Sequence, residues 1–154
     1  MKINYFLIPL LTVFVSVFGS WLTSGGMDWY KTINLPDWTP PGSFIGAMWT
    51  TIFILATISA IIIWNSFPRD QRFWQIIWLF AGNAVLNVLW SYLFFNQHLF
   101  GPAVAEATLL ALSVFGLMFL IWPVSSVAAA LLFLYAGWAS FATYVTYSIW
   151  ILNR

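Results

Sequence analysis

Long apolar runs separated by short polar breaks dominate this chain. Five such runs cover approximately residues 3–23, 43–65, 73–95, 102–122 and 127–152. Each is close to the roughly 20 apolar residues that a helix needs to cross the hydrocarbon core of a bilayer. The pattern therefore predicts an all-α integral membrane protein, in which a bundle of five transmembrane helices forms one domain over residues 1–154.

The break between the first two runs differs from the others. The later breaks are short turns, whereas this one carries the sequence W-Y-K-T-I-N-L-P-D-W-T-P-P at residues 29–41. Its three prolines fix φ and stiffen the path of the chain. We interpret the segment as a long structured loop that covers a cavity for a flat apolar ligand. An aromatic belt at the membrane interface is the alternative interpretation.

Composition narrows the class of protein. Of the 154 residues, 62% are hydrophobic and only 6% are charged, whereas ordinary soluble domains are about 25% charged. The sequence has no cysteine, which excludes disulfides, thiolate metal ligands and cysteine nucleophiles. One histidine and four acidic residues argue against a metal site, and a net charge of +1 gives no reason to expect a nucleic-acid partner.

The basic residues indicate an orientation in the membrane. Lys2, Arg69 and Arg72 fall on one face of a five-helix bundle, and Lys31 and Arg154 fall on the other. Because basic residues favour the cytoplasmic side, we expect a cytoplasmic N-terminus and an outside position for the loop between the first two helices.

Polar residues occur inside the third apolar run. Asn83, Asn87, Trp90 and Phe94 share one helical face, because residues three and four apart are neighbours on a helix. Asparagine is costly against lipid, so this face is expected to point toward protein or a cavity, with Ser91 continuing the wall. The amides could bind a ligand, or they could form hydrogen bonds between helices.

The fourth run and the turn before it contain three further features. Glu106 is an intramembrane acid, which suggests function, although near the helix end it could also reach water or a neighbouring helix. His98 lies in the turn, and we expect it to be solvated rather than to ligate haem. Ala103, Ala107 and Ala111 form a small-residue stripe that permits close helix approach, which favours a homodimer.

Taken together, these motifs resemble the tryptophan-rich sensory protein / translocator protein family (TspO/MBR), also called peripheral-type benzodiazepine receptors. The resemblance rests on the loop motif followed by Trp49, on N-A-V-L-N-V-L-W-S-Y-L-F-F at 83–95, and on W-A-S-F-A-T-Y at 138–144. It extends over essentially the whole chain, and Glu106 falls where the family tends to carry an acidic residue.

The resemblance implies a five-helix bundle, often dimeric, with a pocket closed by the first loop. It implies a membrane receptor for tetrapyrroles, chiefly protoporphyrin IX, and for benzodiazepine-receptor-type drugs. Some bacterial members are linked to light-dependent oxidative breakdown of the bound porphyrin, which needs no cofactor besides the pigment. The alternative is a transporter or regulator of porphyrin or steroid movement across the membrane without chemistry.

The resemblance also assigns site residues. Trp49 and Trp138 match the family's pocket-wall tryptophans. An indole offers a flat face and an N–H donor, and it can donate an electron to a photo-excited porphyrin, so these two are the candidate catalytic residues. The alternative is that the tryptophans are structural and serve helix packing or anchoring at the membrane interface. The expected ligand-binding residues are Trp29, Tyr30, Trp38, Pro40, Trp49, Phe53, Asn83, Asn87, Trp90, Ser91, Glu106, Trp138 and Ala142.

Two departures from the family pattern limit which properties of the family we expect in this chain. Leu35 stands where the family usually has a lysine before a loop proline, so no loop cation is expected to act on the ligand. Tyr147 and Arg154 are separated by six residues, one more than the proposed cholesterol-recognition pattern allows. We therefore do not predict cholesterol binding.

Overall fold

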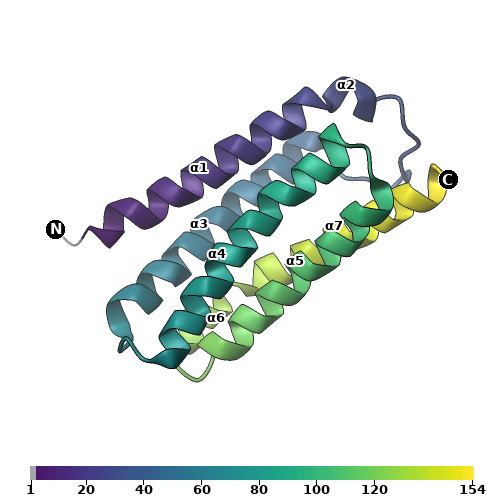
Figure 1. Cartoon of the computed structure of the whole chain (residues 1–154). Coiled ribbons are helices and arrows are strands. Elements are labelled where there is room, and N and C mark those ends of the chain that lie inside the picture. Colours follow the sequence, from purple (N-terminus) through teal and green to yellow (C-terminus); the bar gives the residue numbers. More distant parts are fainter. Residues whose placement is uncertain (1–2) are drawn as a thin grey trace.

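The computed structural model describes residues 3–154, which contain only helices and the segments that join them. The five long helices are α1 (Asn4–Gly25), α3 (Gly42–Ser66), α4 (Gln71–Ser91), α5 (Phe100–Ile121) and α7 (Phe133–Leu152). The three short ones are α2 (Met27–Tyr30), the π-helical turn η1 (Tyr92–Asn96) and α6 (Ser126–Ala130). Figure 1 shows the long helices side by side, with α2 and the C-terminus at one end of the bundle and the N-terminus at the other.

Five helical segments are long and apolar enough to cross a bilayer. Hydrocarbon offers no hydrogen-bond partners, so a spanning segment must satisfy its backbone internally. The chain is therefore an integral, multi-pass membrane protein, and the predicted five-helix fold is confirmed. The segments span 4–25, 42–66, 71–96, 100–121 and 126–152, within two residues of the expected bounds.

The last membrane segment is interrupted between α6 and α7, which the apolar pattern does not predict. At the break, the fully buried Ser59 of α3 donates a 2.8 Å hydrogen bond to the carbonyl of Ala128. In a continuous helix that carbonyl would accept from the N–H of Leu132. Leu132 instead bonds to the carbonyl of Ala129, at 3.0 Å. A single hydroxyl from a neighbouring helix therefore accompanies the break in the helical ladder.

The buried apolar side chains form two clusters toward opposite ends of the bundle. The larger one lies toward the α3–α4 turn and includes the fully buried Ile63, Phe73 and Leu117. The smaller one is centred on Phe94 and Phe95 at the other end.

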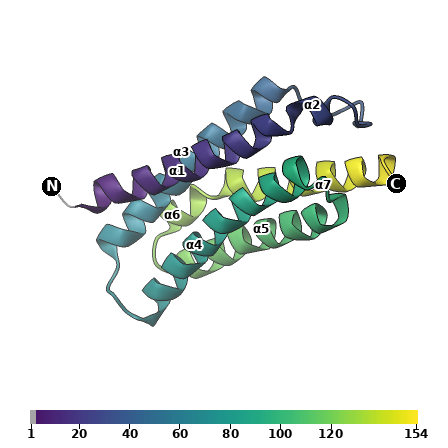
Figure 2. The ribbon, with the colours of Figure 1, turned by 45° about the horizontal axis from the view of Figure 1, so that its top comes forward.

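Helix α1 is the long helix that its neighbours cover least. It packs against α3, α4 and η1, and Figure 2 shows it on the outside of the bundle beside α3. Only Asn4 and Leu22 of α1 are buried. Its inward face therefore borders open space along much of its length.

The alanine stripe of α5 is buried inside this chain. Ala103, Ala107 and Ala111 are all buried, and Thr143 of α7 donates a 3.0 Å hydrogen bond to the carbonyl of Ala107. Small side chains here allow α5 and α7 to approach closely. The stripe therefore provides no surface for a second copy, and the homodimer stays a prediction without this support.

Gly26 joins α1 to α2 at a point where the chain passes very close to η1. A Cβ at this position would meet the carbonyl oxygen of Phe95 and lie 2.7 Å from its Cβ. Most of the atoms met are backbone or backbone-proximal, so they cannot swing aside. Glycine is needed here for this close approach.

We expect Gly26→Ala to destabilise the protein by about 1–3 kcal/mol, as overpacking does elsewhere. The melting temperature in detergent should fall by several degrees, measured by circular dichroism. Gly82→Ala is the matched control, because a Cβ there has nothing within 4 Å and alanine favours a helix. Equal melting temperatures for the two variants would contradict the steric argument.

Candidate ligand-binding cavity

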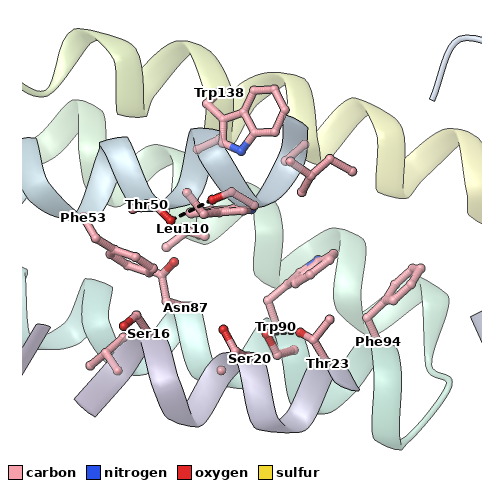
Figure 3. A pocket seen from close by; sticks show the side chains of 18 of the residues that line it. Ser16, Ser20, Thr23, Thr50, Phe53, Asn87, Trp90, Phe94, Leu110 and Trp138 are labelled. Atoms are coloured by element: carbon pink, nitrogen blue, oxygen red, sulfur yellow. Dashed lines mark hydrogen bonds between the residues drawn. The ribbon is translucent and has the colours of Figure 1, made fainter. Parts of the chain in front are cut away.

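A cavity of about 800 Å³ lies between α1, α3, α4 and α7, beneath the segment 27–41. We call this segment the lid. The volume falls within the roughly 300–1,000 Å³ typical of small-molecule sites. Figure 3 shows side chains from α1, α3, α4 and α7 pointing into the same space.

Aromatic side chains from α3 and α7 form one wall. Trp49 lies 5.9 Å from Phe53 between ring centroids and meets Tyr135 edge-on at 6.1 Å. Trp138 is 8% exposed, and its Nε1 has no hydrogen-bond partner among the described residues. Figure 3 shows this nitrogen turned toward the cavity. The wall therefore combines flat apolar faces with an unpartnered donor.

Helix α4 supplies Asn87, Trp90 and Ser91 to the opposite side. Trp90 continues the aromatic surface, since it stacks on Phe94 at 5.1 Å. Its Nε1 is a second buried indole nitrogen without a partner in the described part of the chain. The two indole donors come from different helices. Buried polar atoms without a hydrogen-bond partner are unusual in folded proteins.

The orientation of Asn87 is set by a buried hydrogen-bond network. Tyr135 donates to Oδ1 of Asn83 at 2.8 Å, so its oxygen is free to accept from the side-chain amide of Asn87. The same amide donates to the backbone carbonyl of Asn83 at 3.0 Å. Asn83 in turn donates to Ser113 at 2.8 Å. Because its N–H groups are occupied, Asn87 presents a carbonyl oxygen to the cavity.

Helix α1 contributes a row of hydroxyls that the sequence analysis did not single out. Thr12, Ser16, Ser20 and Thr23 all line the cavity, and Figure 3 shows Ser16, Ser20 and Thr23 on its α1 side. Their spacing of three or four residues places them on one helical face. This spacing is the feature of the sequence that could have identified them as a polar helical face within the first membrane span.

Two of these hydroxyls connect α1 to its neighbours. Thr57 of α3 donates to Thr12 at 2.8 Å, and Thr23 donates to Ser91 of α4 at 3.5 Å. Ser20 forms no side-chain hydrogen bond among residues 3–154. Ser20 is therefore the hydroxyl of this row whose proton is free to be donated to a ligand.

The lid places its aromatic residues in two different roles. Tyr30 and Pro40 line the cavity, and burial raises the pKa of the Tyr30 phenol, so it stays uncharged at neutral pH. Trp29 stacks on His98 with 3.9 Å between ring centroids. Trp38 stacks on Tyr144 of α7 at 5.3 Å. Trp29 and Trp38 therefore fasten the lid to the bundle rather than line the cavity.

The structure brings together nine of the expected ligand-binding residues around the cavity: Tyr30, Pro40, Trp49, Phe53, Asn87, Trp90, Ser91, Trp138 and Ala142. Four lie outside the lining: Trp29, Trp38, Asn83 and Glu106. Glu106 is 4% exposed, and neither of its carboxyl oxygens has a partner in the described part of the chain. It lies beside Ala107, which does reach the cavity.

The cavity lining contains no charged side chain among the described residues. Its polar groups are hydroxyls, one amide and indole N–H groups. Within residues 3–154, no cluster of three or more histidine, aspartate or glutamate side chains could hold a metal ion. The arrangement suits binding of a flat apolar molecule through stacking and a few hydrogen bonds.

Comparison with known proteins adds an independent line of evidence. The model of the TspO/MBR family matches residues 7–151. The chain is 35% identical over 126 residues to the tryptophan-rich protein TspO of Bacillus cereus, which covers 81% of this chain and 80% of that protein. It is 32% identical over 138 residues to the protein of the same name from Archaeoglobus fulgidus, covering 88% and 87%. Against the human translocator protein it is 28% identical over 153 residues, covering 98% and 89%.

The network around Tyr135 gives a first test of the site. Tyr135→Phe removes the donor to Asn83 and the acceptor of Asn87, and we expect a loss of about 1 kcal/mol in stability. For a chain of this size that corresponds to a fall of roughly 2–4 °C in melting temperature. Tyr144→Phe is the control, because the Tyr144 ring stacks on Trp38 while its hydroxyl forms no hydrogen bond within residues 3–154. Equal losses in both variants would remove the network from the argument.

Proposed function

Because the chain belongs to the TspO/MBR family, we propose that it is a membrane receptor that binds tetrapyrroles, chiefly protoporphyrin IX, in the cavity beneath the lid. Drugs of the benzodiazepine-receptor type would occupy the same space. Family membership supports ligand binding by a membrane protein in general. The choice of tetrapyrrole rests on the chemistry of the lining.

One observation carries the proposal: an 800 Å³ cavity is lined by indole and phenyl rings from α3, α4, η1 and α7. A porphyrin is planar and apolar on both faces, so it gains most from stacking against rings. Figure 3 shows Trp138 and Trp90 on different sides of this space, and Trp49 lines it from α3. No other described pocket combines this size with an aromatic lining.

We further propose that the bound porphyrin is oxidised in the light. The excited macrocycle takes one electron from an indole of Trp49 or Trp138 and then combines with dioxygen. The adduct returns one electron to the indole radical cation, so the indole is restored. The net change is the addition of one dioxygen molecule to the macrocycle, and dioxygen is the oxidant consumed. Hydrolytic chemistry has no support, because the lining holds no charged acid or base.

We also propose the orientation expected from sequence, although Lys2, which makes the count three basic residues against two, lies outside the described residues. Arg69 and Arg72 lie at the α3–α4 turn, on the end of the bundle where α1 begins. Lys31 and Arg154 lie at the opposite end with the lid. The proposal places the α3–α4 turn in the cytoplasm and the lid outside.

Binding can be measured directly. Titration of the purified protein with protoporphyrin IX in the dark should quench tryptophan fluorescence and shift the visible bands of the pigment. Saturation at about one pigment per chain is expected, because one cavity of suitable size is described. A protein that produced neither quenching nor a band shift would refute tetrapyrrole binding.

The photochemical step has a separate test. In the double variant Trp49→Phe, Trp138→Phe we expect bleaching of the bound pigment under light to slow at least tenfold, while dark binding weakens only a few-fold because phenyl rings still stack. Trp78→Phe with Trp122→Phe is the matched control, since both of these side chains are exposed away from the cavity. Bleaching is followed by absorbance, with and without dioxygen.

Unchanged bleaching in the cavity double variant would remove the indoles from the mechanism. Bleaching that continues without dioxygen would remove the proposed oxidant. Neither result would affect the binding proposal.

A further inference from the structure

The proposed ligand is an acid, but the described lining of the cavity carries no positive charge. Four basic side chains lie within residues 3–154, and none of them lines the cavity. Lys31 is paired with Asp28 at 2.9 Å on the exposed face of the lid. Arg154 lies over Trp150, and Arg69 lies over Trp64 and Phe73 near the opposite end. Arg72 lies in the first turn of α4 at that same end.

The hydroxyls of the lining mostly present acceptors rather than donors. Ser16 donates to the carbonyl of Val13 at 2.9 Å, and Thr50 donates to that of Gly46 at 2.9 Å. Thr146 on α7 donates within its own helix in the same way, at 2.8 Å. A hydroxyl whose proton is given to its own backbone shows an oxygen lone pair to the ligand. These groups therefore suit a ligand that donates a hydrogen bond.

The amide of the α4 wall has the same polarity. The N–H groups of Asn87 are occupied by Asn83 and Tyr135, so its free group is the carbonyl oxygen. The lining donors that remain unpaired within residues 3–154 include the indole N–H groups of Trp90 and Trp138 and the hydroxyls of Tyr30, Ser20 and Ser91. An ionised carboxylate accepts hydrogen bonds only, so neutral donors of this kind would be its only partners, and the acceptor oxygens beside them would repel it.

Titratable groups near the cavity do not place a cation among these hydrogen-bond donors and acceptors within residues 3–154. Tyr30 from the lid carries a phenol, which is neutral at pH 7 in any case, and burial raises its pKa further. Glu106 lies on α5 behind the wall and offers a carboxyl group. Tyr135 from α7 is engaged with the α4 amides, and His98 stacks on the outer lid residue Trp29. The cavity-lining residues of α1 and α3 include no titratable side chain.

We propose that the cavity binds its ligand in an uncharged form: a planar molecule whose edge carries protonated carboxyl, ester, carbonyl or hydroxyl groups. Removing a carboxylate from water without a cation beside it is costly even where neutral donors remain. A protonated carboxyl group instead donates its O–H to an acceptor such as Asn87 and accepts from an indole or from Ser20. This inference rests on the proposed tetrapyrrole binding and adds the charge state that the site selects.

The direct test compares protoporphyrin IX with its dimethyl ester, using the whole protein in lipid nanodiscs and tryptophan quenching in the dark. At pH 8 the ester should bind at least threefold more tightly than the diacid, after subtraction of binding to empty nanodiscs. At pH 5.5 the affinity of the diacid should rise at least threefold, since its carboxyl groups become protonated, while that of the ester stays unchanged. A diacid that binds within threefold of the ester at pH 8, or more tightly, overturns the proposal.

A designed cation provides an internal comparison that cancels membrane partitioning. Ser20→Lys places an ammonium group at the cavity, and the ratio of diacid to ester affinity at pH 8 should rise about tenfold, equivalent to about 1.4 kcal/mol. Gln97→Lys adds the same charge in an exposed turn and should leave the ratio unchanged. An equal ratio in Ser20→Lys and wild type, in correctly folded protein, overturns the proposal.

The outcomes distinguish a failure of the proposed tetrapyrrole binding from a failure of the proposed charge selection. If neither porphyrin binds the wild-type protein, the proposed function fails. If both bind and the diacid is preferred at pH 8, tetrapyrrole binding stands and the charge selection fails. The comparison in the wild-type protein decides the matter even if the lysine variant does not fold.

Discussion

The structure depends on one constraint: the hydrocarbon around it forms no hydrogen bonds, so a polar group in a spanning helix is costly unless the protein itself satisfies it. Backbone groups meet this demand by forming helices. Side chains meet it by bonding to their own helix, as Thr50 and Thr146 do, or by linking helices, as Asn83 and Tyr135 do. The polar atoms therefore gather between the helices, and the lipid-facing surface is left to large apolar residues.

The same demand gives the cavity its chemical character. A hydroxyl that bonds to its own backbone no longer offers a proton, so a wall built from such residues is rich in acceptors. Rigid indole and phenyl rings surround this wall but do not fill the space, because α1 packs less closely than the other long helices. Most of the cavity surface is therefore apolar, its polar groups are few, and the described lining carries no charged side chain.

The sequence predicted the features that depend on local pattern and missed those that depend on distant partners. Apolar length gave the five spans, and helical spacing placed Asn83 and Asn87 on one face. Spacing could not decide which of them reaches the cavity, because Tyr135, 52 residues from Asn83, settles that. The break between α6 and α7 depends on Ser59, 69 residues from Ala128. No local pattern contains either pairing.

The contacts that hold the lid against the bundle are also aromatic rather than charged. Its one described ion pair is Lys31–Asp28, which lies on the exposed face where water screens it. Closure instead depends on the rings of Trp29 and Trp38 stacked on His98 and Tyr144. These aromatic contacts join the lid to the bundle without supplying charge. A site with few waters raises the free-energy cost of burying an ion, so a lid of this composition fits the proposed binding of an uncharged ligand.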